Sequence, residues 1–463
     1  MSSLKFGTSG LRGLVSDLTD DVCAAYTHAF LAHMQTKGDL ASVLLVGHDL
    51  RSSSPRIAQA CMKAALSLGI EVENCGVLPT PALALRAMSR KAFALMVTGS
   101  HIPDDRNGLK FYRPDGEIDK EDEKGILTHF DRGGCAMSPN AIPETSTDAY
   151  DAYFARCASI LPSGALSGKR IGVYQHSSAA RDLMMKLIEA LGGKAIGVAR
   201  SEVFVPVDTE ALRLEDVALA KAAAQELMLD ALISTDGDAD RPLVADERGI
   251  FLRGDTVGLL TARFVQADAV ATPVTSSTAA ELSGFFAHVH RCRVGSPYVI
   301  AAMEETKRQG ATVIVGYEAN GGVLLGSPWG TISALPTRDA MLPILAVLGL
   351  AAARGATVSE LMAELPGRFT ASGRIEHVDA SLSGPFLAAL ANAGHAQHYF
   401  AELGKVHEAD AIDGQRFMLE GGDVIHYRAS GNAPELRCYV EAESQERAQE
   451  VLQWGLTKAA RAL

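Results

Sequence analysis

The sequence has no block of basic residues and no stretch in which lysine or arginine alternates with aromatic side chains. The formal net charge of its 463 residues is −12. Proteins that bind nucleic acids usually present a clustered positive surface, so we expect no nucleic-acid partner. An acidic chain can still bind phosphate groups through local clusters of arginine, lysine and backbone N–H groups.

Paired cysteines and long apolar runs are also missing. The seven cysteines are scattered and show no Cys-x-x-Cys spacing, which argues against a disulfide framework and a structural zinc site and favours a reducing compartment. The N-terminus lacks the profile of a signal peptide, and no apolar run approaches the ~18 residues of a membrane span. We therefore expect a cytoplasmic protein that does not bind membranes.

The sequence does contain a repeated unit. An apolar β-type run, a serine-containing turn and a helix-type segment follow one another three times, with the runs beginning at residues 42, 170 and 269. Strands that alternate with helices predict related α/β domains with mainly parallel sheets. From residue 368 onward the pattern changes to short strands and two helices, which predicts a smaller α+β domain. The expected domains are 1–143, 144–251, 252–367 and 368–463.

The strand predicted over 93–97 ends in Thr98-Gly-Ser-His101. Open α/β sheets bind their ligands at the carboxyl ends of strands, so the hydroxyl of Ser100 is a candidate for chemistry. A serine after a strand is more often a turn or N-cap residue. This stretch alone leaves both interpretations open.

A second apolar strand, predicted over 228–235, runs into three carboxylates, Asp236, Asp238 and Asp240. Three carboxylates on one glycine-containing loop repel one another unless a hard cation neutralises them. A calcium EF-hand begins with the same pattern, but Arg241 occupies the position at which that loop needs glycine. We therefore predict a divalent metal site that is not an EF-hand.

Three further loops carry polar groups suited to anions or sugars, and each has a plain structural alternative. The N-terminal stretch 4–13 is a candidate anion loop or a flexible terminus, the stretch 316–322 a sugar-binding loop or a capped glycine turn, and the stretch 426–434 a phosphate loop or a surface turn. The side chains concerned are Thr8, Ser9, Arg12, Glu318, Asn320, Arg428, Ser430 and Asn432.

In this order the segments resemble the α-D-phosphohexomutase family over essentially the whole chain. Any one segment is weak evidence, but five in the family order are strong. The five are Gly7-Thr-Ser-Gly-Leu-Arg-Gly13, Thr98-Gly-Ser-His101, Asp236-Gly-Asp-Ala-Asp-Arg241, Gly316-Tyr-Glu-Ala-Asn-Gly-Gly322 and Arg428-Ala-Ser-Gly-Asn-Ala-Pro434. The resemblance implies three related mixed-sheet α/β domains and a smaller C-terminal α+β domain around a central cleft.

The resemblance also implies an isomerase that interconverts hexose 1-phosphates and 6-phosphates through a phosphoserine and a 1,6-bisphosphate. Ser100 would carry the phosphate, and Mg²⁺ would be held by a phosphoserine oxygen and by Asp236, Asp238 and Asp240. Phosphoryl transfer depends mainly on positioning and on neutralised charge, which such an ion supplies. Glucose or mannose 1,6-bisphosphate is the expected activator.

The remaining binding roles follow from the same resemblance. Glu318 and Asn320 would bind the sugar, and Arg428, Ser430, Gly431 and Asn432 the phosphate that does not react. Thr8 and Ser9 of the N-terminal motif would contact substrate. Gly295 and Ser296 lie in a segment, 294–298, that fits the position of a second specificity loop.

Two residues are candidates for the group that transfers the proton. Asn107-Gly-Leu-Lys110 resembles the family's Asn-Gly-x-Lys, which makes Lys110 the first candidate for the general base and His101 the second. Arg12 and Arg241 would stabilise charge, because arginine is a poor base at neutral pH. Many bacterial relatives carry Ser and then His in the sugar loop, but Asn320 and Gly322 stand there in this sequence. Any role of that histidine is therefore absent or moved.

We expect mannose phosphates as the preferred substrates, with glucose phosphates as further ones, and a monomer or small homo-oligomer. Glucosamine phosphate is the main alternative substrate. A metal-dependent phosphomonoesterase and a non-catalytic sugar-phosphate binding protein are remoter alternatives.

Overall fold

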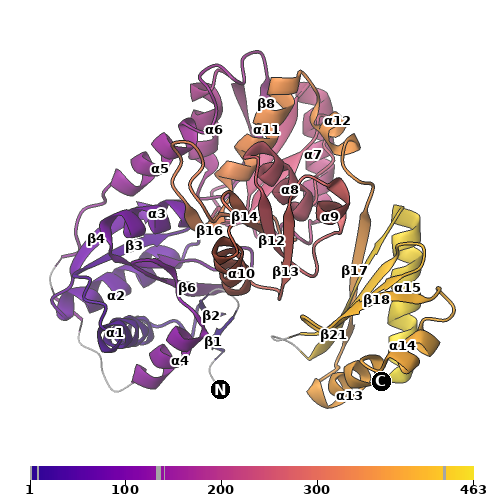
Figure 1. Cartoon of the computed structure of the whole chain (residues 1–463). Coiled ribbons are helices and arrows are strands. Elements are labelled where there is room, and N and C mark those ends of the chain that lie inside the picture. Colours follow the sequence, from indigo (N-terminus) through magenta and orange to yellow (C-terminus); the bar gives the residue numbers. More distant parts are fainter. Residues whose placement is uncertain (1–2, 8–9, 132–136, 140, 431–433) are drawn as a thin grey trace. The chain divides into compact units, whose positions relative to one another are not determined.

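The computed structural model describes residues 3–7, 10–131, 137–139, 141–430 and 434–463 (Figure 1). The chain divides into two compact units. The larger unit comprises Met1–Ala267 and Thr312–Leu361, and the smaller unit comprises Asp268–Ala311 and Met362–Leu463. The four domain ranges expected from the sequence stay a prediction. Among the described helices, none combines the length and apolar character needed to cross a membrane.

The first sheet of the larger unit has the strand order β1-β2-β6-β5-β3-β4, and β7 pairs with β6. Helices α1 and α2 lie on one side of these strands and α3 on the other (Figure 1). The strands are β1 (Lys5–Phe6), β2 (Leu11–Leu14), β3 (Val43–His48), β4 (Glu71–Val77), β5 (Phe93–Val97), β6 (Arg106–Arg113) and β7 (Gly116–Glu117). The helices are α1 (Asp20–Thr36), α2 (Ser54–Ser67), α3 (Thr80–Arg90) and α4 (Lys120–His129).

Aromatic rings hold the centre of this sheet to α1. The ring centroid of Phe30 lies 5.6 Å from that of Phe93 on β5 and 5.0 Å from that of Phe111 on β6. All three side chains are buried, and such pairs add about 0.5–1.5 kcal/mol to the burial of their area. The two strands that flank residues 98–105 therefore rest on a packed core.

The second sheet has the order β11-β10-β8-β9. Its strands and helices are α5 (Asp148–Ala158), β8 (Arg170–His176), α6 (Arg181–Ala190), β9 (Lys194–Arg200), α7 (Leu214–Leu227), β10 (Ala231–Thr235) and β11 (Pro242–Ala245). Further elements of the larger unit are α8 (Gly254–Phe264), the antiparallel strands β14 (Ile314–Tyr317), β15 (Val323–Leu325) and β16 (Leu335–Asp339), and α11 (Met341–Arg354). Helix α12 (Val358–Ala363) begins in the larger unit and ends in the smaller one.

Three polar loops of the larger unit share one design: each connects two antiparallel neighbours. Residues 98–105 join β5 to β6, residues 236–241 join β10 to β11, and residues 318–322 join β14 to β15. The sequence predicted mainly parallel sheets, and β3, β4 and β5 and likewise β8, β9 and β10 do pair in parallel. The strand after each polar loop returns antiparallel, because a loop this short cannot form a parallel crossover.

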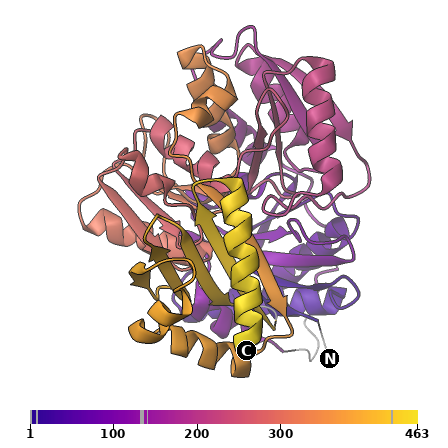
Figure 2. The same ribbon diagram turned by 90° about the vertical axis from the view of Figure 1, so that its right-hand side faces the viewer.

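The smaller unit contains a parallel pair of strands and a C-terminal antiparallel sheet with the order β17-β21-β20-β19-β18. Helix α15 lies along one face of that sheet (Figure 2). The elements are β12 (Ala269–Pro273), α9 (Ala279–Ser283), β13 (His288–Cys292), α10 (Ser296–Arg308), β17 (Phe369–Glu376), α13 (Ala380–Leu390), α14 (Ala393–Tyr399), β18 (Val406–Asp410), β19 (Gln415–Leu419), β20 (Val424–Ala429), β21 (Glu435–Ala442) and α15 (Gln445–Ala462).

The helix expected after Thr278 is the short helix α9, which ends where Gly284 adopts a left-handed conformation (φ 64°). One expectation about helices was wrong. The described part of 368–463 contains three helices instead of two. The additional helix is explained by Asn392, whose side chain accepts a hydrogen bond from the backbone of His395 and so starts α14 just after α13 ends at Leu390.

Candidate active site

Ser100 is buried in the loop between β5 and β6. Its φ is 57°, in the left-handed region that residues with a side chain rarely adopt. The backbone N–H of Ser100 donates to Thr98 Oγ1 at 2.7 Å, and Ser100 Oγ donates to Asp236 Oδ2 at 2.5 Å. Such backbone strain concentrates at functional sites, so the turn interpretation alone does not account for this serine.

Arg51 fixes the backbone of the Ser100 loop, defined as residues 98–105. Its guanidinium donates to the carbonyls of Ser100 and Ile102 at 3.0 and 2.6 Å. It also donates to the carbonyls of Pro103 and Arg106 at 2.8 and 3.0 Å. The Arg51 side chain is fully buried, so these bonds are shielded from water and fix the loop backbone.

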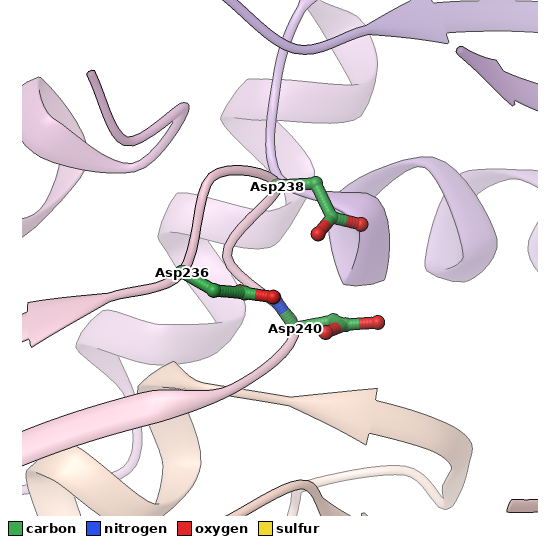
Figure 3. Close-up of side chains that lie close together, drawn as sticks. All are labelled: Asp236, Asp238 and Asp240. Carbon is green, nitrogen blue, oxygen red and sulfur yellow. The ribbon is translucent and has the colours of Figure 1, made fainter. Parts of the chain in front are cut away.

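The metal loop, defined as residues 236–241, projects three carboxylates to one side (Figure 3). One oxygen of each of Asp236, Asp238 and Asp240 lies within 4.8 Å of the others, and all three residues are buried. The loop approaches the Ser100 loop closely at Gly237, where a Cβ atom would stand only 2.7 Å from the carbonyl oxygen of Ser100. Glycine at that position therefore allows the carboxylates to reach the serine.

The carboxylates fit a divalent cation. Asp238 Oδ1 and Asp240 Oδ1 are buried and accept no hydrogen bond from the described residues. An orphaned carboxylate oxygen is costly in a buried site unless it has a positive partner. Hard oxygen ligands are those that Mg²⁺ prefers, so the unused oxygens suit that ion.

Lys110 belongs to the same cluster. Its ammonium lies 2.6 Å from Asp238 Oδ2 and 2.6 Å from Asp240 Oδ2, and Thr80 Oγ1 also donates to Asp238 Oδ2. The antiparallel register of β5 and β6 places Lys110 opposite Met96, a few residues before Ser100. Lys110, the first candidate for the general base, is therefore brought to the carboxylates and not to the serine hydroxyl.

The surroundings shift the pKa values of Asp236 and Asp240 in opposite directions. Burial and the repulsion from Asp240 and Asp238 raise the pKa of Asp236. Burial also acts to raise the pKa of Asp240, but the cations Arg338 and Lys110 outweigh it and hold that pKa below its usual range. Asp240 therefore loses its proton more readily than Asp236 does.

His101 is oriented by Arg241. Arg241 Nη1 donates to His101 Nδ1 at 3.0 Å, and the same ring nitrogen lies 3.2 Å from Ser100 Oγ. Burial and the charges of Arg241 and Arg12 lower the pKa of His101 to about 2. The imidazole is therefore neutral at neutral pH and cannot begin as a proton donor.

Arg12 brings to the site a guanidinium that has a nitrogen without a hydrogen bond to the described residues. Its strand β2 pairs with β6, with Arg12 opposite Gly108. Arg12 Nη2 is buried and has no hydrogen-bond partner among the described residues, and burial, followed by the charges of Arg241 and Arg338, lowers the pKa of Arg12 to about 10. An anion is the ligand that such a guanidinium lacks.

The sugar loop, defined as residues 318–322, forms a tight turn. Glu318 N–H donates to the carbonyl of Gly322 at 3.0 Å, and Asn320 Oδ1 accepts from Gly322 N–H at 2.9 Å. Glu318 Oε2 is buried without a hydrogen-bond partner among the described residues, which leaves an acceptor for a sugar hydroxyl. Burial raises the pKa of Glu318, although Arg338 and Arg241 oppose this effect.

The smaller unit holds the other predicted residues. Gly295, with φ 126°, precedes α10, which begins at the buried Ser296. Asp413 Oδ2 accepts from Arg428 Nε at 2.7 Å and from Val294 N–H at 3.1 Å. Asp413 thus joins the 294–298 segment to the first residue of the predicted phosphate loop.

Some predicted residues cannot be placed, and others were missed. Thr8, Ser9, Gly431 and Asn432 lie outside the described residues, whereas Ser430 N–H donates to the carbonyl of Glu435 at 3.0 Å. The sequence did not single out Arg51, Thr80, Arg338 or Asp413. Arg51 stands beside the serine-rich turn of the first repeat, a signal that could have found it, but the other three give no local signal.

Three family models match this chain. The phosphoglucomutase/phosphomannomutase α/β/α domain I matches residues 3–135, domain III matches 253–369, and the C-terminal domain matches 387–453. A phosphomannomutase from Sinorhizobium fredii is 45% identical over 98% of this chain and 98% of its own length. A phosphomannomutase from Salmonella muenchen is 47% identical over 96% and 93%.

Solved structures agree in fold. A phosphoglucomutase/phosphomannomutase family protein from Burkholderia thailandensis has a TM-score of 0.78 at 20% identity and covers 98% of this chain and 97% of its own. An N-acetylphosphoglucosamine mutase from Aspergillus fumigatus, solved with GlcNAc-6P and magnesium, has a TM-score of 0.57 at 14% identity and covers 100% and 95%. The mixed-sheet α/β class with a C-terminal α+β domain is thereby confirmed. This chain belongs to the phosphoglucomutase/phosphomannomutase family, which is the α-D-phosphohexomutase family that its motifs resemble.

Proposed function

We propose that this phosphohexomutase interconverts mannose 1-phosphate and mannose 6-phosphate, with Ser100 as the phosphate carrier. The observation that carries the proposal is the hydrogen bond from Ser100 Oγ to Asp236, beside the unused oxygens of Asp238 and Asp240. A serine placed against a cation-binding cluster suits phosphoryl transfer. The preference for mannose is supported by the two phosphomannomutases that are 45% and 47% identical to this chain.

The ion that the carboxylates would hold is Mg²⁺, with Asp236, Asp238, Asp240 and an oxygen of phosphorylated Ser100 as ligands. When bound, it would neutralise charge on the group that is being transferred. Arg12 and Arg241 would add positive charge at the same place, since each has a buried guanidinium nitrogen that forms no hydrogen bond with the described residues.

In the first half-reaction the phosphoryl group leaves Ser100 Oγ and bonds to the free hydroxyl oxygen of the sugar phosphate. That hydroxyl loses its proton to a base, for which the sequence offered Lys110 as the first candidate, while Ser100 Oγ takes up a proton. The resulting 1,6-bisphosphate turns over and returns its other phosphoryl group to Ser100 Oγ, which gives up its proton, while the sugar oxygen that is left receives one. Glucose or mannose 1,6-bisphosphate would load the resting serine.

The remaining predicted residues would bind the substrate. Glu318 Oε2 would accept a sugar hydroxyl, and Asn320 would contact a second one. The phosphate that does not react would bind Arg428, Ser430, Gly431 and Asn432, with Gly295 and Ser296 near the N-terminus of α10, where N–H groups favour anions. Thr8 and Ser9 would contact the substrate beside Arg12.

The test is a parallel assay of mannose, glucose and glucosamine 1-phosphates with Mg²⁺ and a trace of 1,6-bisphosphate. We expect the 6-phosphate isomer to appear fastest from mannose 1-phosphate and no inorganic phosphate to be released. The Ser100→Ala variant, folded as judged by circular dichroism, should be inactive on all three.

Each other outcome has a definite meaning. Preference for glucosamine 1-phosphate would contradict the assigned sugar, and release of inorganic phosphate would indicate a phosphomonoesterase. Full isomerase activity of Ser100→Ala would contradict the phosphate carrier.

A further inference from the structure

Arg338 lies between the sugar loop and the metal loop. It is on β16 and only 3% exposed. Its Nη2 is 2.8 Å from Asp240 Oδ2, and its Nη1 is 3.7 Å from Glu318 Oε2. One rigid, planar guanidinium thus faces a carboxylate of each loop with a different nitrogen.

The two oxygens of Asp240 have separate surroundings. Oδ2 receives Arg338 Nη2 and Lys110 Nζ, whereas Oδ1 is buried, accepts no hydrogen bond from the described residues and lies 3.7 Å from Arg241 Nε. A carboxylate held through one oxygen presents the other in a fixed direction. Arg338 therefore helps to aim the oxygen that a cation would use, and this reduces the ordering that cation binding would otherwise require.

Gly322 makes room for this arrangement. A Cβ atom at Gly322 would lie 2.5 Å from Arg338 Cδ and 2.8 Å from Arg338 Cγ, much closer than atoms can approach. Gly322 is not among the residues with positive φ, so its backbone conformation does not itself demand glycine. A side chain at this position would collide with the arginine, so glycine at 322 is required for the position that Arg338 occupies.

We propose that Arg338 is a positioning residue that couples sugar binding at Glu318 to cation binding at Asp240. The proposal rests on the sugar-binding and metal-binding roles given above under the proposed function. A sugar hydroxyl that donates to Glu318 Oε2 partly neutralises that carboxylate and so weakens its attraction for the guanidinium of Arg338. The guanidinium then holds Asp240 more firmly, and the cation binds more tightly; by thermodynamic reciprocity, the cation strengthens sugar binding equally.

The coupling is measured as a ratio of two dissociation constants. Mg²⁺ is titrated calorimetrically into the full chain carrying Ser100→Ala, which prevents turnover, first alone and then with saturating mannose 6-phosphate. The ratio cancels whatever a substitution does to the affinity for Mg²⁺ alone. In this parent we expect mannose 6-phosphate to tighten Mg²⁺ binding at least about fivefold, the lower end of usual coupling.

Three substitutions in the parent then test the role of the guanidinium. Arg338→Met removes the positive charge. Arg338→Lys keeps the charge but places it on one ammonium group, which cannot contact Asp240 and Glu318 through separate nitrogens. Gly322→Ala pushes the side chain away without changing either carboxylate. In all three the ratio should fall to about one, close to an uncoupled site. In Arg213→Met, which removes an arginine paired with Asp216, and in Gly384→Ala, the parental ratio should remain.

A parental ratio in Arg338→Met, or no tightening in the parent itself, would overturn the proposal. If Arg338→Met does not fold, Gly322→Ala and Arg338→Lys decide by the same criterion. Because these are binding measurements, they are independent of the proposed reaction. A chain that couples its ligands but forms no hexose 6-phosphate would contradict the reaction alone, and an active chain without coupling would contradict only the role of Arg338.

Discussion

The left-handed φ of Ser100 suits glycine, yet the loop holds a serine there through bonds to Thr98 and Arg51. Residues with a Cβ atom lose roughly 1–2 kcal/mol in this conformation. Ser100→Gly should therefore be more stable than Ser100→Ala by about 1 kcal/mol, although both lack the hydroxyl and both should be inactive. Urea unfolding of the two variants measures the difference. An alanine variant that equals or exceeds the glycine variant in stability would show that the loop is not strained.

Arg51 is the residue whose loss should damage the Ser100 loop most. Arg51→Met leaves the buried carboxylate of Asp49 without its cation, and it leaves three carbonyls of the loop and that of Arg106 without their donor. Breaking a buried ion pair from one side costs about 3–5 kcal/mol, and we expect a loss of unfolding free energy of that size together with loss of turnover.

Denaturant titration measures the effect of Arg51→Met. Arg248→Met is the control, because Arg248 also pairs with an aspartate two residues before it but is exposed. It should cost no more than about 1 kcal/mol. Similar losses in the two variants would contradict the supporting role of Arg51.

At the scale of elements, the metal loop should behave as a cation site in the absence of substrate. Three buried carboxylates with two unused oxygens repel one another, so a cation that binds only the folded chain stabilises it. At a free Mg²⁺ concentration 100 times the dissociation constant, the gain is about 2.7 kcal/mol. Thermal unfolding with increasing Mg²⁺ should show a rising midpoint in the native sequence and in Asp115→Asn, an exposed control. Asp240→Asn should show little or no rise, and a rise equal to the native one would argue against this loop as the site.

The three polar loops could be predicted from the sequence because each interrupts an apolar strand with glycine and charged residues. Their convergence could not, since Ser100 and Asp236 are 136 positions apart and only the packing of two sheets brings them together. Arg338 was missed for the same reason. It stands on a strand, where an arginine has no local signature, and its partners Asp240 and Glu318 lie on other hairpins. The only hint of Arg338 in the sequence was Gly322, which stands where many relatives carry histidine.

Helix lengths in the smaller unit were also hard to predict. Capping side chains such as Asn392 decide where a helix restarts, and apolar periodicity does not record them. The alternation of strands and helices predicted mainly parallel sheets, and only the family resemblance implied mixed ones, because a strand that is buried on both faces reads as an apolar run in either direction.

For the whole molecule, buried histidines predict weakening on the acid side of neutrality. Burial lowers the pKa of His176 in the larger unit and of His426 in the smaller unit to about 4, from an ordinary value of 6.5. Between these values the unfolded chain binds protons that the folded chain does not, so stability falls as the pH drops from about 6.5 to 4. Each group can account for about 3 kcal/mol once the pH is below 4.

Denaturant titrations at several pH values between 7 and 4 measure this slope. His176→Gln should reduce it for the larger unit, where His101 also contributes, and His426→Gln should reduce it for the smaller unit, whereas the exposed His407→Gln should leave it unchanged. A slope that survives both buried substitutions would assign the acid sensitivity to other groups.

The central claim is that Ser100 carries the phosphate, and peptide-resolved mass spectrometry tests it most directly. The full chain is first incubated with Mg²⁺ and mannose 1,6-bisphosphate. One portion is digested at once, and a second portion receives excess mannose 1-phosphate before it is digested. The account predicts one phosphate on the peptide that contains Ser100, and transfer of that phosphate to the sugar when mannose 1-phosphate arrives. A phosphate on another residue, or an unmodified Ser100 in a preparation that isomerises the sugar, would contradict it.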